Sequence, residues 1–441
     1  MAKGLLCLLV LALILVGCAS EAGLAPGPTP QTIRFITDDQ AGEGRLRWQE
    51  PVSLSDAGAR SPQVAVTSEG VVHLVWVQEV SGHMSRLVYR RFADGMWSEP
   101  ETVAEGSVGN HRIAVDGLCR LHLVWEEGAG YKMSGQIMYR VRTGEGTWSE
   151  VEDLTESVGV KAAPGVTAGS DGSFHLAWSR EPWGQDSLWY VWRKPDGAWQ
   201  EPEEVREWEW GEKPAGVGGM SAGPCPALAV DGDGTVHLAW GENAHILWGK
   251  DVQPRGLLRY AERVGGKWSK PVDLFHFQKG VSIPALAMDG EGRLVLLLET
   301  EWIESKMYPG VQKEVDRSAF FLMWRDHGGT WSVPETVPNI GLQARDVGFT
   351  VDGTGRVHLV WSERVMEGGQ CSYQVFSTYR RGEEPSWDIA YVVPLGGSRV
   401  LEEELVAVAD GRLLLVAAVA PDGDFSESRV VALEGGFEPF E

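Results

Sequence analysis

Cysteine is scarce in this chain, with 5 in 441 residues. Apart from Cys7 and Cys18 near the N-terminus, the remaining cysteines are Cys119, Cys225 and Cys371, and no two of them form a Cys-x-x-Cys pair. An odd number of isolated cysteines argues against a disulfide framework, and the lack of paired ligands argues against a zinc site. We therefore expect no metal and no cofactor.

Positive charge is also in short supply. The chain has 39 Lys and Arg against 62 Asp and Glu, which gives a formal net charge of −23. Such a surface repels dense negative charge, so nucleic acid and anionic lipid headgroups are unfavourable partners. Acidic excess is also a common solubility device in exported proteins, and this alternative reading stays open.

Long apolar runs are absent except at the N-terminus. Lys3 precedes an apolar run from Leu5 to Val16, and Leu-Val-Gly-Cys follows at residues 15–18. A short positive region, an apolar core of about a dozen residues and a small residue before the cut predict a signal peptide over residues 1–17, too short to span a membrane as a mature helix.

The segment Leu-Val-Gly-Cys resembles the lipobox of bacterial lipoproteins. The resemblance implies cleavage before Cys18 and lipid attachment to that residue, whereas an ordinary signal peptide with a chance cysteine is the alternative. Residues 18–44 contain three closely spaced prolines and predict an extended tether. We expect an extracytoplasmic, membrane-anchored lipoprotein that reaches the membrane only through its lipid and is a monomer.

What the chain does contain is a repeat. The phrase His-Leu-x-Trp occurs as VHLVW from Val72, LHLVW from Leu121, FHLAW from Phe174, VHLAW from Val236 and VHLVW from Val357. Degenerate copies follow as LVLLL from Leu294 and LLLVA from Leu413. A repeat of about 50 residues with several short strands per unit predicts a propeller or a related array.

Each unit has four β-rich runs separated by turns rich in Gly, Asp and Pro. The second run is the His-Leu-x-Trp phrase, the third carries an aromatic residue, and the fourth begins with tryptophan, at Trp97, Trp148, Trp199, Trp268, Trp331 and Trp387. Short strands in this order predict a four-stranded antiparallel blade.

The two ends of the chain predict how the ring closes. RWQEPVSL from Arg47 is a fourth-run phrase that precedes any first run, and the C-terminal unit stops after its third run. Placing residues 46–54 on the outer edge of the last unit completes it and removes two exposed strand edges. We therefore predict an all-β, seven-bladed β-propeller over residues 45–441, closed by an N-terminal strand on the last blade.

The predicted ligand site lies on the face that carries the connections of variable length. Second–third loops are expected at Glu79–Arg86, Glu242–Gly256 and Glu363–Ser372, among others, and variable loops on a rigid scaffold often carry binding residues. The candidate site combines tryptophans with polar groups: Trp208, Trp210, Trp248, Trp302, Glu242, Asn243 and His245. Such a set suits a glycan, peptide or protein ligand. Alternatively, the rings only pack against their own loops.

Two repeated features are interpreted as structural. The histidine of His-Leu-x-Trp occurs at the same position in five units, so we expect a buried, hydrogen-bonded residue between blades rather than one catalytic site. Turns such as DGDG from Asp231 resemble fragments of calcium loops but lack the bidentate glutamate at the twelfth position. They are predicted to be tight turns that need glycine at positive φ.

The repeat and turns such as ADGMW from Ala93 resemble the sialidase-like superfamily of propellers with Asp-box-type repeats. The resemblance implies a carboxylate-binding arginine triad. Arg60 starts a partial Arg-Ile-Pro motif, Arg345 falls at the same position in a later unit, and Arg112 lies three places further in. No complete Asp box is present, the nucleophilic tyrosine is not assignable, and sialidases have six blades.

Two function classes follow from these observations, with a purely structural role as a third. One is a lipid-anchored, non-catalytic propeller that binds a glycan, peptide or protein on its variable face. The other is a sialidase-like glycoside hydrolase that uses Arg60, Arg112 and Arg345 to grip a carboxylate, with an unassigned carboxylic acid as the proton donor. A convergence of the three arginines with a Tyr–Glu pair would favour the hydrolase.

Overall fold

In the computed structural model the propeller belongs to one compact unit, Phe35–Glu441. The structure describes residues 45–438, except for gaps at 82–83, 129–134, 156–163, 181–186, 207–225, 249–250, 278–283, 290, 301–302, 305–311, 314–318, 339, 341–344, 368–369, 381–386, 389, 396–398, 409–411 and 422–423. The predicted signal peptide, Cys18 and the tether lie outside the described residues. Among the residues searched, none forms a helix long and apolar enough to cross a membrane.

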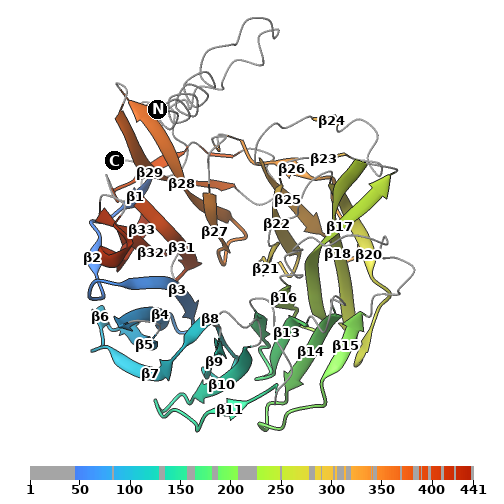
Figure 1. The fold of residues 1–441 in the computed structure, drawn as a ribbon, viewed down its shortest axis with the longest axis horizontal. Helices are drawn as coiled ribbons and strands as arrows, with labels where there is room; N and C mark the ends of the chain where they lie inside the picture. Colours follow the sequence, from blue (N-terminus) through green and yellow to red (C-terminus); the bar gives the residue numbers. More distant parts are fainter. Residues whose placement is uncertain are drawn as a thin grey trace, which may run out of the picture. The chain divides into compact units, whose positions relative to one another are not determined.

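Seven antiparallel sheets follow one another around a ring in chain order (Figure 1). Blade 1 consists of β3 (Ala59–Val66), β4 (Val72–Ser81), β5 (Met84–Ala93), β6 (Met96–Trp97) and β7 (Glu101–Gly106). Blade 2 consists of β8 (Val108–Val115), β9 (Leu121–Glu127), β10 (Gln136–Arg142) and β11 (Glu152–Asp153). Blade 3 consists of β12 (Gly165–Ala168), β13 (Phe174–Arg180), β14 (Ser187–Arg193) and β15 (Glu203–Arg206). Blade 4 consists of β16 (Ala227–Val230), β17 (Val236–Trp248), β18 (Asp251–Val264), β19 (Lys267–Trp268) and β20 (Val272–Phe277).

The remaining three blades repeat this order. Blade 5 consists of β21 (Ala285–Met288), β22 (Leu294–Thr300), β25 (Ala319–Arg325) and β26 (Glu335–Thr336), with a separate pair, β23 (Ile303–Glu304) and β24 (Gln312–Lys313). Blade 6 consists of β27 (Arg345–Val351), β28 (Val357–Glu367), β29 (Gln370–Arg380) and β30 (Tyr391–Val393). Blade 7 consists of β31 (Arg399–Ala407), β32 (Leu413–Ala420), β33 (Arg429–Glu438), β1 (Arg45–Trp48) and β2 (Val52–Ser53).

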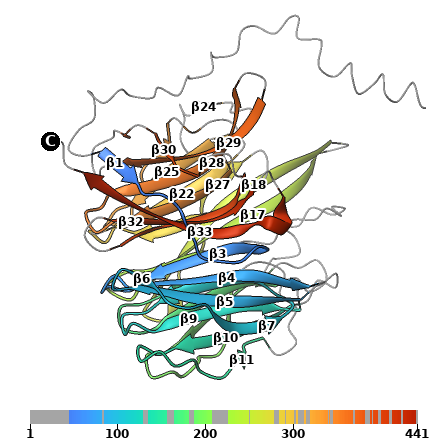
Figure 2. The same ribbon diagram turned by 90° about the vertical axis from the view of Figure 1, so that its left-hand side faces the viewer.

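The ring closes through the N-terminal strand, as the sequence predicts. β1 pairs antiparallel with β33, with Arg45 opposite Glu438 and Trp48 opposite Gly435, and it lies beside the C-terminal strands in Figure 2. Gly435 is required here because a Cβ atom at that position would lie 2.9 Å from the Trp48 ring. The Trp48 indole also donates a hydrogen bond to Ser377 Oγ at 2.9 Å, which ties the closing strand to blade 6.

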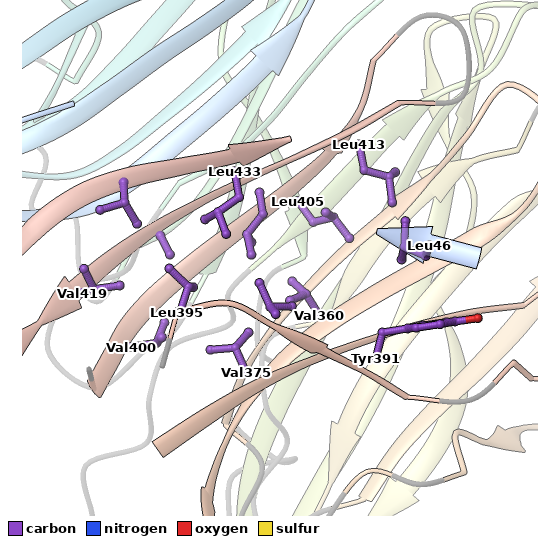
Figure 3. Close-up of a cluster of buried hydrophobic side chains, with 14 of the residues drawn as sticks. Leu46, Val360, Val375, Tyr391, Leu395, Val400, Leu405, Leu413, Val419 and Leu433 are labelled. Atoms are coloured by element: carbon purple, nitrogen blue, oxygen red, sulfur yellow. The ribbon is translucent and has the colours of Figure 1, made fainter. Parts of the chain in front are cut away.

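The core lies between neighbouring blades, so the second strands are buried on both faces. In β4, all residues from Val72 to Gln78 are buried. The cluster between blades 6 and 7 includes Val360, Leu405 and Leu433, together with Leu46 from the closing strand (Figure 3). Burial on both faces explains why the His-Leu-x-Trp phrase is apolar without alternation.

The repeated histidines are buried and hydrogen-bonded, which confirms their structural interpretation. His122 Nε2 lies 3.0 Å from Asp116 Oδ2, and its Nδ1 lies 2.8 Å from the Tyr139 hydroxyl. An ionised carboxylate accepts the proton on Nε2, so Nδ1 accepts the tyrosine hydroxyl and the ring stays neutral. Its ring also stacks on Phe174 of the next blade, with centroids 4.5 Å apart. Corresponding His–Tyr contacts occur at His73, His175 and His237.

The aspartates of the Asp-Gly turns accept hydrogen bonds from the backbone of their own turn. Asp231 Oδ1 accepts hydrogen bonds from the backbone N–H groups of Asp233 and Thr235 at 3.0 and 2.7 Å, and Gly234 has φ +78°. These contacts are those of a tight turn with glycine at positive φ, as predicted. No cluster of His, Cys, Asp and Glu suited to a metal ion occurs among the residues that were searched.

Candidate functional site

The structure describes only part of the ligand site predicted from sequence. Trp208, Trp210 and Trp302 lie outside the described residues. Glu242, Asn243, His245 and Trp248 are described in backbone alone, and they belong to β17. Their assignment as ligand-binding residues therefore stays a prediction.

Three of the expected second–third loops are extended hairpins, so predicting loops there was wrong. β17 stays paired with β18 out to Trp248 and Asp251, and β28 stays paired with β29 out to Glu367 and Gln370. β4 and β5 pair as far as Ser81 and Met84. Pairing satisfies the backbone N–H and C=O groups even where the polar sequence gives no strand pattern.

We call the end of the propeller that carries the hairpins between second and third strands the hairpin end. At this end the inner strands contain β-bulges in four successive blades. Register shifts occur between Arg60 and Gln63 in β3, between Gly109 and Arg112 in β8, between Arg345 and Gly348 in β27, and between Val400 and Glu402 in β31. Ser61 and Asn110, inside two of these bulges, have positive φ values of 52° and 45°. A bulge redirects the side chains around it and is frequent beside functional sites.

The register shows that three polar residues occupy one repeated position. Gln63, Arg112 and Glu404 each face a valine of the second strand, namely Val75, Val124 and Val416. The corresponding residues of the other blades are all small: Gly165, Ala227, Ala285 and Gly348. Since β3 contacts both β31 and β8, the polar residues lie on neighbouring inner strands of blades 7, 1 and 2.

Glu404 is the carboxyl group at the centre of this arrangement. Gln63 Nε2 donates a hydrogen bond to Glu404 Oε1 at 2.6 Å, across the boundary between blades 1 and 7. Burial raises the pKa of Glu404 to about 7, although the positive charge of Arg112 and the Gln63 hydrogen bond lower it. Near neutral pH this carboxyl therefore exists in both protonation states.

His111 and Arg60 complete the group. His111 is buried, and its Nε2 lies 3.2 Å from the backbone oxygen of Val75, whereas Nδ1 has no hydrogen-bond partner among the described residues. The pKa of His111 is lowered to about 3, mainly by burial and also by the charges of Arg112 and Arg60, while the hydrogen bond with Val75 acts in the opposite direction. Arg60 is partly exposed, and its Nε lies 3.5 Å from Glu79.

We call the set of Arg60, Gln63, His111, Arg112 and Glu404 the inner-strand cluster. The cluster includes two of the three arginines singled out in the sequence, Arg60 and Arg112. The charge of each lowers the pKa of His111. Arg345 begins β27, but its side chain lies outside the described part of the structure. The described side chains therefore provide two members of the proposed triad.

Sequence reasoning missed Glu404 and an arginine of the same strand. Arg399, at the start of β31, places its guanidinium carbon 5.7 Å from the Tyr373 ring centroid and 5.1 Å from that of Phe425. Phe425 is 55% exposed. The available signal was the acidic run from Glu402 to Glu404, which interrupts a strand that is otherwise apolar.

Comparison with known proteins places the chain at the level of fold. No protein-family description and no curated protein matches the sequence. A solved structure of an ulvan lyase of polysaccharide lyase family PL25 is 9% identical and covers 87% of this chain and 95% of its own, with a TM-score of 0.59. The intramolecular trans-sialidase from Ruminococcus gnavus is 12% identical, covering 87% and 94%, with a TM-score of 0.44. The α-L-arabinofuranosidase Arb93A from Fusarium graminearum is 12% identical, covering 88% and 97%, with a TM-score of 0.47.

This chain is a seven-bladed β-propeller whose fold is similar to that of the ulvan lyase. At these identities the likeness concerns the fold, and a shared propeller hosts many unrelated activities. The function must be argued from the residues of the site.

Proposed function

We propose that this protein is a lipid-anchored, extracytoplasmic propeller that binds an acidic glycan at its hairpin end, using the inner-strand cluster. The observation that carries the proposal is the meeting of polar side chains from blades 7, 1 and 2: Gln63 bonds Glu404, and Arg112 acts on the same carboxyl. Three separate blades supply these groups at a position where the other blades have only glycine or alanine.

The chemistry of the cluster favours a ligand with acid groups. Arg60 and Arg112 are close enough to act on one imidazole, in a chain whose net charge is −23. Guanidinium groups bind carboxylates and sulfates through charge-assisted hydrogen bonds. The unpartnered Nδ1 of buried His111 is a further group for a ligand or a water, since buried polar atoms are normally hydrogen-bonded.

The fold comparison supports the same class of ligand. The ulvan lyase was solved bound to -[GlcA(1-4)Rha3S]-, a sugar chain that carries acid groups. We further propose that Trp208, Trp210, Trp248 and Trp302, with Glu242, Asn243 and His245, extend the binding surface. This extension rests on composition, since aromatic rings and polar groups together suit sugars.

A glycan array with acidic and neutral chains tests the proposal. The native protein should bind acidic chains, and Arg112→Gln should weaken this binding about tenfold, the loss expected for a charge-assisted hydrogen bond. Arg412→Gln, which removes the same charge from an exposed arginine at the opposite end of the inner strands, is the matched control. Equal binding by both variants would exclude the inner-strand cluster as the site.

A second candidate function is glycoside cleavage of the sialidase-like kind, favoured by one observation. Glu404, with its pKa of about 7, is a carboxylic acid able to donate a proton near neutral pH, and Arg112 acts on it. In this alternative Arg60, Arg112 and Arg345 grip the substrate carboxylate. A fluorogenic glycosidase panel decides between the functions: turnover that disappears in Glu404→Gln supports cleavage, and no turnover by the native protein supports binding alone.

The anchoring proposal has a separate test. Cys18→Ala should move the protein from the membrane fraction to the soluble exported fraction, because the lipid supplies the membrane affinity. The melting temperature of the variant should match that of the native propeller. Continued membrane association would mean that another segment holds the protein there.

A further inference from the structure

A groove of about 600 Å³ lies at the rim between blades 5 and 6, formed by third and fourth strands rather than inner strands. Its lining includes Trp324, Val333, Pro334, Glu335, Arg380 and Trp387. Both tryptophans are partly exposed. No residue of the inner-strand cluster contributes to it.

Blade 5, which supplies most of the groove, departs from the repeat of blades 1 to 4. In blades 1 to 4 one third-strand position holds a tyrosine, and each ring meets the edge of a tryptophan from the next blade, as with Tyr139 and Trp199 at 4.9 Å or Tyr190 and Trp268 at 5.0 Å. Register places Leu322 at this position in blade 5, opposite Leu297. Leucine is shorter than tyrosine and has no ring, so Leu322 does not offer Trp387 of blade 6 the ring contact that the tyrosines make with the corresponding tryptophans.

At the edge of the groove, blade 5 has an apolar residue where blades 1 to 4 have a charged one. The second residue after the fourth-strand tryptophan is Glu99, Glu150, Glu201 or Lys270 in blades 1 to 4, but Val333 in blade 5. Val333 is 60% exposed. Blade 5 therefore differs from blades 1 to 4 at two positions, and the second of them, Val333, makes the edge of the groove apolar.

An ion pair fixes the walls and leaves them without net charge. Arg380 donates from Nε and Nη2 to the two oxygens of Glu335 at 3.1 and 3.0 Å, and the Trp387 indole donates to Glu335 Oε1 at 3.0 Å. The Arg380 guanidinium carbon lies 4.3 Å from the centroid of the Trp324 ring. The rings are thus held by a bidentate pair, a geometry that limits side-chain freedom.

We propose that this groove is a second carbohydrate site, for one or two residues of a neutral sugar chain. Tryptophan rings beside prolines and valine offer flat apolar surfaces for the C–H faces of a pyranose, and the paired charges give no preference for an ionic ligand. The volume of about 600 Å³ lies in the range of small-molecule sites.

Binding of neutral hexasaccharides, cellohexaose and mannohexaose, tests this site by saturation-transfer NMR and calorimetry on the complete chain. Val333→Glu restores the residue of blades 1 to 3 at an exposed position, so it should fold normally and weaken binding at least about fivefold. Trp324→Ala should weaken it at least about tenfold, the effect expected when a stacking ring is removed. Glu150→Val, the reciprocal change in blade 2, should leave affinity unchanged.

The outcome separates this site from the inner-strand cluster. Retained hexasaccharide binding in Arg112→Gln, together with its loss in Val333→Glu, supports the rim site even if no acidic glycan binds the protein. Undetectable binding of both hexasaccharides to the native chain would overturn the proposal. So would equal affinity in the native chain and Val333→Glu, or a loss of binding in Arg112→Gln.

Discussion

The inner strands of blades 3, 4 and 5 differ from those of blades 6, 7, 1 and 2. In the first group β12, β16 and β21 have 4 residues each and pair without a register shift. In the second group β27, β31, β3 and β8 have 7, 9, 8 and 8 residues, and each contains a bulge. The blades share one repeat, yet only the second group carries charged groups at the inner strands.

This contrast shows how a repeat acquires a site. The second and third strands keep the buried residues that hold neighbouring blades together, so they stay alike around the ring. One side of the inner strand does not take part in this packing. A bulge there changes the direction of the side chains without disturbing the blade. If this explanation holds, blades 3 to 5 share their core packing with blades 6, 7, 1 and 2 and differ from them in the inner strands.

The largest effect is expected from removing the closing strand of blade 7. Deleting residues 1–55 takes away buried Leu46 and Leu54 together with the β1 and β2 pairing, and should cost on the order of 5 kcal/mol or more. Deleting residues 1–40 leaves β1 in place and should change little. Thermal unfolding compares the two, and equal melting temperatures would refute the role of this strand.

The shared core should respond equally in both groups. Trp240 in blade 4 and Trp361 in blade 6 are 1% and 0% exposed. Changing either to alanine should cost about 3–5 kcal/mol, because each leaves a large cavity. Urea unfolding measures the change in the free energy of unfolding. A loss below about 1 kcal/mol in one of the two variants would show that equivalent tryptophans are not packed alike in both groups of blades.

Ring closure and blade number could be predicted from sequence because their signals are local and repeated. Each His-Leu-x-Trp phrase is a short run of residues. The phrase at Arg47 has no unit of its own, and the last blade is the unit that lacks a fourth strand. The extended hairpin of β17 and β18 could not be predicted in this way, because a strand that reaches beyond the packed faces has no core side and shows no alternation.

The inner-strand cluster lay beyond sequence reasoning for another reason. Gln63, Arg112 and Glu404 are far apart in the chain, and only the ring brings them to one place. Arg112 and Arg60 also occupy different repeated positions, because Arg112 corresponds to Gln63 and Arg60 corresponds to Gly109. Arg60 and Arg112 were found through a motif, but Glu404 has no motif to mark it.

The repeated histidines should make the shared core sensitive to acid. Burial lowers the pKa of His175 from 6.5 to about 4, with the charges of Arg263 and His122 acting in the same direction and that of Asp171 against them. The unfolded chain therefore binds a proton that the folded chain does not, and stability falls as the pH drops from about 6.5 to 4, by about 3 kcal/mol for a shift of this size. His175→Gln should flatten this slope in urea unfolding at pH 7 and pH 4.5. An unchanged slope would show that His175 titrates alike in both states.

Glu404 should make stability change with pH in the opposite direction to His175 and by a smaller amount. The pH dependence thus distinguishes the inner strands from the core. Its folded pKa of about 7 lies above the ordinary 4.5, so the folded chain holds a proton that the unfolded chain has lost. Stability from this group is complete below pH 4.5 and declines as the pH rises through 7, by about 1–3 kcal/mol because the side chain is only partly buried. Glu404→Gln cannot ionise and should be more stable than the native protein at pH 8 and nearly equal at pH 4.5. Glu402→Gln, the exposed neighbour in β31, serves as the control, and a difference of the same size in that variant would assign the effect to general charge repulsion instead of the Glu404 carboxyl.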